Sequence, residues 1–213
     1  MIVNVTMLTH GRTRLTEQAL QTLAANTDLA SYTFTAFDDD AKLGTGAARN
    51  RVIEMAMVAP HDLLYLSDND VAFLPGWLSI LTEAYEVGHD LFGVTAIGAY
   101  LHPFNQPYQR IGYWSDELGD IAEIGLVHAL STQSWLWSWK DALRFGPFVE
   151  TPVGKVGCSE DVEMSQRIVA AGGKLAVIIP NRVVNTSLTN TFGQDVVGRS
   201  QLEQEPSYGA VRE

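Results

Sequence analysis

The feature that most constrains the fold of this sequence is the regular alternation of short β-rich runs and amphipathic helical runs over its first half. Leu15, Ala19 and Leu23, for example, fall on one face of a helix. Because β-α-β units place their strands parallel, this order predicts an α/β protein with a parallel sheet flanked by helices. The expected strands are Ile2–Leu8, Tyr32–Phe37 and Asp62–Leu66, and further helices are expected over Ala47–Met57 and from Pro75.

The second half has a different texture, which predicts a mixed sheet. A strand over Asp90–Ile97 is followed by a loop rich in proline and aromatic residues and by shorter β-like runs as far as Trp139. Ser159 can cap a helix over Glu160–Ala171, and another strand is expected over Lys174–Ile179. We expect one domain over residues 1–197, with halves 1–98 and 99–197 sharing one sheet, and a polar tail over 198–213.

Composition limits the classes of protein and partner. With 46% hydrophobic and 18% charged residues, the 213-residue chain can form one continuous core. The net charge of −11 disfavours tight binding to nucleic acid. A single cysteine, Cys158, excludes an internal disulfide and suits a reducing compartment. With no basic leader and no apolar run of about 18 residues, we expect a cytoplasmic protein without a membrane span.

Acidic residues follow the third expected strand directly, as Asp68-Asn69-Asp70. In open α/β sheets, ligands bind beyond the carboxyl ends of the strands. Carboxylates at such a position suit Mg²⁺ or Mn²⁺, which bind through one or two side chains plus ligand phosphates. The alternative is a simple turn, because Asp and Asn favour turns. The position at a strand end favours a metal and nucleotide-diphosphate site.

A second acidic triplet, Asp38-Asp39-Asp40, follows the second strand and leads into a stretch of small residues over Gly44–Asn50. Glycines allow a ligand to approach the backbone, and Arg49 can pair with a phosphate. We therefore assign this segment to binding of the nucleotide. The alternative is a solvated loop and an ordinary helix start, with Arg49 on the surface.

These residues resemble, in order and spacing over about residues 1–180, the GT-A glycosyltransferases, most closely the family 2 type that uses nucleotide-diphosphate sugars. Four segments carry the resemblance: Leu8–Arg12 as the first nucleotide loop, Gly44–Asn50 as G-x-x-x-A-R-N, Asp68–Asp70 as D-x-D, and Gly146–Phe148 followed by Glu160-Asp161 and Arg167. The resemblance implies a GT-A fold, a UDP-sugar donor, Mn²⁺ or Mg²⁺ as cofactor, and inversion at the anomeric carbon.

The resemblance also implies roles for individual residues. Asp161, with Glu160 as second choice, is the expected catalytic base, although both residues could simply stabilise a helix start. Many members have a late histidine that completes the metal site, and here Asn185 or Thr186 occupies that region, which leaves tight metal binding open. The donor-binding residues are expected to be Thr9, His10, Gly11, Arg12, Asp38, Asp39, Gly44, Arg49, Asp68 and Asn69, and the metal ligands Asp68, Asp70 and Asn185.

Trp135 and Trp137 fall on one face if their run is a strand, and they are our candidates for an acceptor platform. The alternative is a packed aromatic core. The expected function is transfer of a sugar to the hydroxyl of a saccharide, lipid-linked or protein acceptor. Two other functions stay open, a sugar-phosphate nucleotidyltransferase and a non-catalytic nucleotide-sugar-binding protein. The first would need a more glycine-rich loop than Thr9–Thr13.

Overall fold

A computed structural model describes residues 1–9, 11, 13–28, 32–40, 43–58, 61–101, 106–115, 121–150 and 160–186. Their strands are β1 Val3–Thr9, β2 Tyr32–Asp38, β3 Leu63–Asp68, β4 Val71–Phe73, β5 Val94–Gly98, β6 Gln109–Ser115, β7 Ile121–Val127, β8 Ser134–Ser138, β9 Lys174–Ile179 and β10 Val183–Asn185. Their helices are α1 Thr13–Asn26, α2 Thr45–Ala56, α3 Trp77–Phe92, α4 Trp139–Phe145 and α5 Glu160–Ala170.

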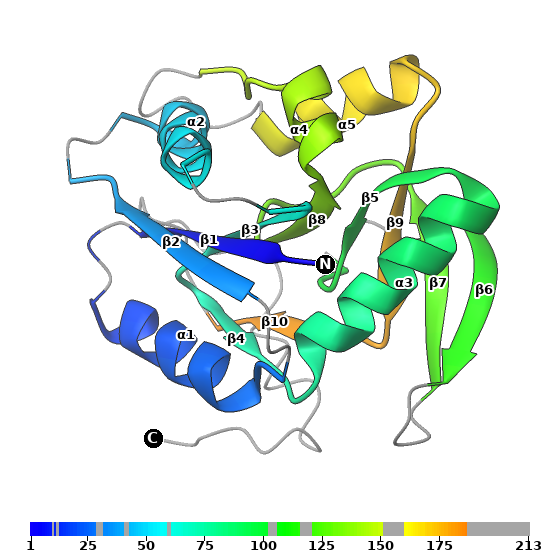
Figure 1. Ribbon diagram of the computed structural model, residues 1–213, viewed down its shortest axis with the longest axis horizontal. Helices are drawn as coiled ribbons and strands as arrows, with labels where there is room; N and C mark the ends of the chain where they lie inside the picture. The colour runs from blue at the N-terminus through cyan, green and yellow to red at the C-terminus, as the bar shows by residue number, and fades with distance from the viewer. Residues whose placement is uncertain are drawn as a thin grey trace.

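The described strands form one large sheet and one small sheet (Figure 1). The large sheet has eight strands in the order β2-β1-β3-β8-β5-β9-β7-β6. Only β7 and β8 run against the other six, because β8 is antiparallel to both β3 and β5 and β7 is antiparallel to both β9 and β6. The small sheet pairs β10 with β4. The expected mixed, mostly parallel sheet is confirmed.

Helices cover both faces of the large sheet, and the alternation of side chains along each strand supplies a core to each face. Figure 1 shows α2, α4 and α5 together above the sheet, and they pack on a cluster that includes Leu64 and Leu66 of β3. Helices α1 and α3 pack on the other cluster, which includes Leu63 and Tyr65 of the same strand. Successive residues of one strand therefore serve opposite cores, as the period of two requires.

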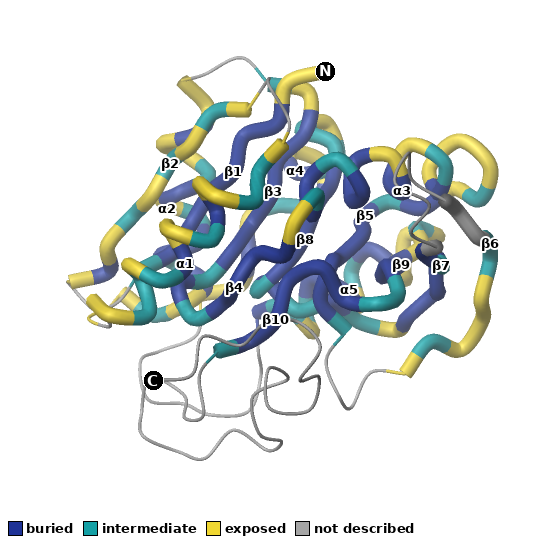
Figure 2. Tube along the Cα trace, turned by 90° about the horizontal axis from the view of Figure 1, so that it is seen from below, coloured by how far each residue is buried: buried dark blue, intermediate teal, exposed yellow. Residues whose placement is uncertain are grey.

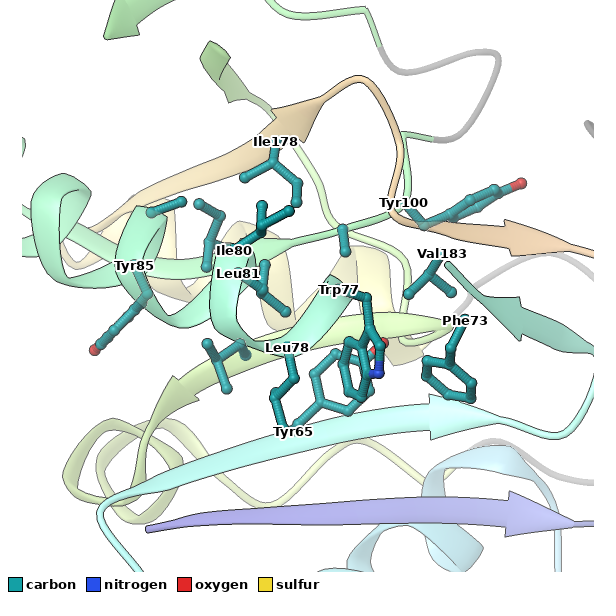
Figure 3. Close-up of a cluster of buried hydrophobic side chains, with 14 of the residues drawn as sticks. Tyr65, Phe73, Trp77, Leu78, Ile80, Leu81, Tyr85, Tyr100, Ile178 and Val183 are labelled. Atoms are coloured by element: carbon teal, nitrogen blue, oxygen red, sulfur yellow. The ribbon is translucent and has the colours of Figure 1, made fainter. Parts of the chain in front are cut away.

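An aromatic group anchors α3 to the sheet. The ring of Trp77 lies 4.7 Å from that of Tyr65 and 4.6 Å from that of Phe73, and Figure 3 shows the three side chains pointing toward one another. All three are fully buried. Figure 2 shows that burial is deepest along β1, β3 and β5 and gives way to exposure toward β2 and β6 at the sheet edges.

Most elements lie where the sequence places them, with two corrections. The expected strand over Asp90–Ile97 begins too early, because α3 continues to Phe92 and Gly93 ends it in a left-handed conformation, φ 70°. The short strands β4 and β10 were not expected at all. None of the described helices is long and apolar enough to cross a membrane.

Candidate functional site

The residues that end β1, β2 and β3 lie side by side at one edge of the sheet. In the strand register, Thr9 is opposite Asp38, and Leu8 is opposite Asp68. The antiparallel strand β8 begins at the same edge, because Ser134 pairs with Ser67. The loop that enters β8 therefore lies at the same edge as the ends of β1, β2 and β3. This edge is the candidate site.

Asp39 shapes the loop that leads into Gly44–Asn50, the segment expected to bind the nucleotide. Its backbone N–H donates to the Thr9 carbonyl at 2.9 Å, and its carboxylate accepts the backbone N–H groups of Leu43 at 2.7 Å and Gly44 at 3.3 Å. Gly44 has φ 95°, which favours glycine. Asp39 is buried and shapes the loop, whereas Asp38 is exposed.

The first nucleotide loop is described only in part. Gly11 is exposed with φ 54°, and His10 and Arg12 lie outside the described residues. The nucleotide-binding role of this loop stays a prediction.

Arg49 is fully buried, so the alternative that it lies on the surface is wrong. Its guanidinium makes an ion pair with Asp68. It also donates to the Ser67 carbonyl at 3.1 Å and to the Thr132 hydroxyl at 2.9 Å. Arg49 thus holds Asp68, the first carboxylate of the D-x-D segment. The pairing of Arg49 with a phosphate stays a prediction, and such a phosphate would bind next to Asp68.

The other residues of the Gly44–Asn50 stretch bind the segment that precedes α5. A Cβ on Gly46 would lie 2.0 Å from the Val149 carbonyl oxygen, so only glycine allows this approach. The Asn50 side chain donates to the Phe148 carbonyl at 3.0 Å and accepts its N–H at 2.8 Å. Two segments about 100 residues apart in sequence are therefore in direct contact through α2.

Arg167 of α5 binds the same segment from its other side. Its Nη1 donates to the carbonyl oxygens of Phe145 at 2.5 Å and Pro147 at 2.9 Å, and its guanidinium pairs with Glu163. These bonds fix α5 against the end of α4 and the residues that follow it.

Asn69 and Asp70 point in different directions. The Asn69 side chain is buried and donates to the Thr16 hydroxyl of α1 at 2.7 Å, so it anchors the segment to α1. The Asp70 carboxylate accepts from Gln133 Nε2 at 3.4 Å, and its backbone carbonyl accepts from Thr186 N at 2.8 Å. Asp70 therefore lies between the loop that enters β8 and the end of β10.

Tyr100 and Asn185 also lie close to Asp70. Burial, and then the negative charge of Asp70, raises the pKa of Tyr100 to about 12, and Figure 3 shows its hydroxyl pointing away from the core cluster. Asn185 is opposite Val71, the residue after Asp70, and is buried. The pairing of β10 with β4 thus brings the region of the expected late ligand next to the D-x-D segment.

The described residues contain no group of three or more His, Cys, Asp or Glu side chains that could hold a metal ion. A divalent cation that binds through one or two carboxylates plus ligand phosphates does not need such a group. Asp68, Asp70 and Asn185 stay the predicted ligands, and the structure places Asn185 opposite Val71, the residue after Asp70.

Glu160 and Asp161 begin α5 but differ in environment. Glu160 is 7% exposed, and it accepts a hydrogen bond from Thr132 at 3.5 Å. Burial raises its pKa to about 7, Arg49 opposes this shift, and the negative charges of Asp161 and Asp68 add to it. Asp161 is more exposed, and its carboxylate accepts the Val162 N–H at 2.8 Å. Ser159, the expected cap, lies outside the described residues.

The raised pKa of Glu160 predicts a pH-dependent contribution to stability. Between the ordinary value of 4.5 and about 7, the folded protein keeps a proton that the unfolded chain has lost, so stability falls as pH rises through this range. Glu160→Gln removes the effect. We expect the unfolding free energy of the variant relative to wild type to rise by on the order of 3 kcal/mol from pH 5 to pH 8. Urea unfolding at each pH measures it, and a pH-independent difference contradicts it.

Trp135 and Trp137 do not form a surface. Both side chains are fully buried, with 0% accessible area, and both pack against Phe148 at 6.1 Å between ring centroids. Neither indole presents a face to an acceptor in this structure. They belong to a packed aromatic core, because β8 is a central strand with helices over both faces of the sheet.

Three residues of the site were missed from the sequence: Tyr100, Thr132 and Gln133. The residues expected at the site come directly after strands in the sequence, at the edge where parallel strands end. Thr132 and Gln133 instead precede β8, whose antiparallel direction brings its beginning to the same edge. Tyr100 shortly follows β5, and only its neighbourhood to Asp70 identifies it. No sequence motif marks any of the three.

Comparison with known proteins supports the fold. No family profile matches the sequence, and no curated protein does. Among solved structures, the chain is similar to GalNAc-T7 with UDP, GalNAc and Mn²⁺, with a TM-score of 0.57, 13% identity, and coverage of 85% of this chain and 42% of that one. It is also similar to S. aureus TarS 1-349, with a TM-score of 0.55, 14% identity, and coverage of 83% and 58%.

Both similar structures are GT-A-type glycosyltransferases, so the fold expected from the sequence is confirmed as GT-A. The chain spans about half the length of these two proteins.

Proposed function

We propose that this protein is a glycosyltransferase that moves a sugar from a nucleotide-diphosphate sugar to an acceptor hydroxyl. The observation that carries the proposal is the meeting of two segments at one sheet edge of a GT-A fold. Asp68 of the D-x-D segment and Glu160 at the start of α5 are linked through Arg49 and Thr132. A donor-side carboxylate and a candidate base are thus linked through one arginine and one threonine at the same edge of the sheet.

The donor belongs to the half over residues 1–98 in this proposal, and the acceptor to the half over 99–197. Thr9, Asp38 and the loop shaped by Asp39 lie at the ends of β1 and β2, where the nucleotide would bind. The similarity to GalNAc-T7 with UDP and Mn²⁺ supports a UDP-sugar. Saccharide, lipid-linked and protein acceptors all remain compatible with the site.

A divalent cation, Mn²⁺ or Mg²⁺, fits the oxygen ligands at Asp70. When bound, it would offset the charge that develops on the leaving diphosphate. Asp70 would hold it, with Asp68 and Asn185 as neighbouring oxygen donors. Arg49 keeps Asp68 in a fixed orientation, because its guanidinium contacts the carboxylate, the adjacent Ser67 carbonyl and Thr132.

Asp161 is the proposed base. A base must reach an acceptor hydroxyl that enters from solvent, and Asp161 is more exposed than its neighbour Glu160. Removal of the proton while the acceptor oxygen attacks the anomeric carbon would give inversion of configuration in a single displacement. Glu160 is the second choice as base because its pKa of about 7 also suits proton transfer.

The proposal is tested by calorimetric titration of UDP with and without Mn²⁺, together with product formation from labelled UDP-sugars. Metal-dependent UDP binding and transfer of label are expected. Binding without transfer to any acceptor or to water would favour a non-catalytic nucleotide-sugar-binding protein. Formation of a nucleotide sugar from a sugar phosphate and a nucleoside triphosphate would favour a nucleotidyltransferase.

Asp70→Asn should weaken Mn²⁺-dependent UDP binding by about tenfold or more, because a neutral oxygen replaces an anionic ligand. Calorimetry of UDP binding at fixed Mn²⁺ measures the effect. Asp40→Asn is the matched control, since Asp40 lies in the other acidic triplet and is exposed. If Asp40→Asn abolishes the metal dependence and Asp70→Asn does not, the metal binds the Asp38–Asp40 triplet.

A further inference from the structure

A chain of contacts with Arg49 and Thr132 buried at its centre runs through the candidate site. It runs from Asp68 to the guanidinium of Arg49, from Arg49 Nη2 to the Thr132 hydroxyl at 2.9 Å, and from that hydroxyl to Glu160 Oε1 at 3.5 Å. Thr132 is 3% exposed and Arg49 is fully buried. The chain joins three elements that are far apart in sequence, α2, the loop before β8, and α5.

The chemistry of Arg49 fixes the direction of these hydrogen bonds. A guanidinium has only donors, so the Thr132 hydroxyl must accept from it. The single hydroxyl proton of Thr132 is then available for Glu160, as the contact to Oε1 shows. One small side chain therefore serves a cation on one side and a carboxyl group on the other.

Glu160 is the residue of the first turn of α5 that reaches into the protein, and Asp161 follows it immediately. Whatever holds the Glu160 side chain also fixes the first turn of α5, and with it the position of Asp161. The next turn of α5 is held at Ser165, whose hydroxyl accepts the Leu130 N–H at 3.0 Å from the loop that carries Thr132. The loop before β8 is thus the support on which α5 begins.

We infer that Thr132 is a positioning residue for the proposed transfer reaction: by bridging Arg49 and Glu160, it sets the place of Asp161 relative to the donor held near Asp68. This inference rests on the proposed function. Thr132 is 3% exposed, and its hydroxyl is engaged by Arg49 and Glu160. It acts through Arg49 and Glu160. Removal of its hydroxyl should therefore lower turnover, while donor affinity, which depends on other residues, should be retained.

Thr132→Val tests the inference, because valine keeps the shape and removes the hydroxyl. We expect kcat for UDP release from UDP-sugars to fall about 10- to 100-fold, since small displacements of a reacting group have effects of this size. UDP affinity with Mn²⁺ should change less than about threefold, because Arg49 keeps its contacts with Ser67 and Asp68. Thr132→Ser, which restores the hydroxyl, should recover kcat to within about threefold.

Thr82→Val is the matched control. Thr82 is a buried threonine of α3 whose hydroxyl donates to the Leu78 carbonyl at 2.9 Å, and it lies in the helix over the other face of the sheet. This variant should lose stability in urea without loss of kcat. If Thr132→Val does not fold, Thr132→Ala replaces it in the comparison with Thr132→Ser.

Two results would overturn the inference alone. One is an unchanged kcat in the variant that lacks the hydroxyl, and the other is an equal loss of kcat in Thr132→Ser, which would show that the hydroxyl bridge alone does not account for the effect. A wild-type protein that neither binds UDP with Mn²⁺ nor releases UDP from UDP-sugars would instead overturn the proposed function, and the inference with it.

Discussion

Asp161→Asn is expected to lower turnover by about 10²- to 10⁴-fold, the usual contribution of a general base, while UDP binding stays close to that of wild type. Asparagine has nearly the same shape as aspartate but cannot take the proton of an acceptor hydroxyl. Steady-state kinetics of UDP release, together with calorimetric UDP binding, separate the two effects. Asp161 lies at the more exposed position of the acidic pair, where an acceptor can reach it.

Two variants of the same helix turn serve as controls. Glu163→Gln removes another acidic residue of the first turn and its ion pair with the partly exposed Arg167, so it should lose about 1 kcal/mol of stability with little effect on turnover. Glu160→Gln keeps an acceptor for Thr132 and should be impaired less than Asp161→Asn. If Asp161→Asn is fully active and Glu160→Gln is inactive, Glu160 is the base. If both are fully active, the acidic pair is not catalytic.

The fold was predictable because hydrophobic periodicity and turn residues determine elements locally. The strand Lys174–Ile179 and the start of α5 at Glu160 lie where the sequence pattern places them. Solved structures with only 13–14% identity have the same fold, which shows that pattern and not residue identity specifies it. The short strands β4 and β10 escaped prediction because three residues carry no usable periodicity.

The sequence predicts the position of a site residue only where strand direction and strand order determine which edge of the sheet that residue reaches. Asp38 and Asp68 reach one edge because both follow parallel strands next to β1. The burial of Arg49 could not be read from the sequence, since its partners Ser67 and Thr132 lie 18 and 83 residues away. Trp135 carried a pattern that fits either a ligand platform or a core, and only the position of β8 inside the sheet decides between them.

Arg49 is a buried positive charge that interacts with two carboxyl groups of the candidate site. Its guanidinium meets Asp68, which is 25% exposed on its side chain, and lowers the pKa of Glu160 against the effect of burial. Two carboxyl groups near one cation repel each other less than they would alone. The arrangement leaves the Asp68 carboxylate partly exposed while the counter-charge on Arg49 stays hidden from solvent.

Arg49→Met is therefore expected to destabilise the fold by about 3–5 kcal/mol, because it leaves Asp68, the Ser67 carbonyl and Glu160 without their donor or counter-charge. The loss should be smaller at pH 5 than at pH 8, since Glu160, with a pKa of about 7, is protonated at the lower pH. Urea unfolding at both pH values measures it. The exposed Arg51 of the same helix pairs with Glu54, both 59% exposed, and Arg51→Ala should cost under about 1 kcal/mol. Equal losses for the two arginine variants would show that the buried pair does not stabilise the fold.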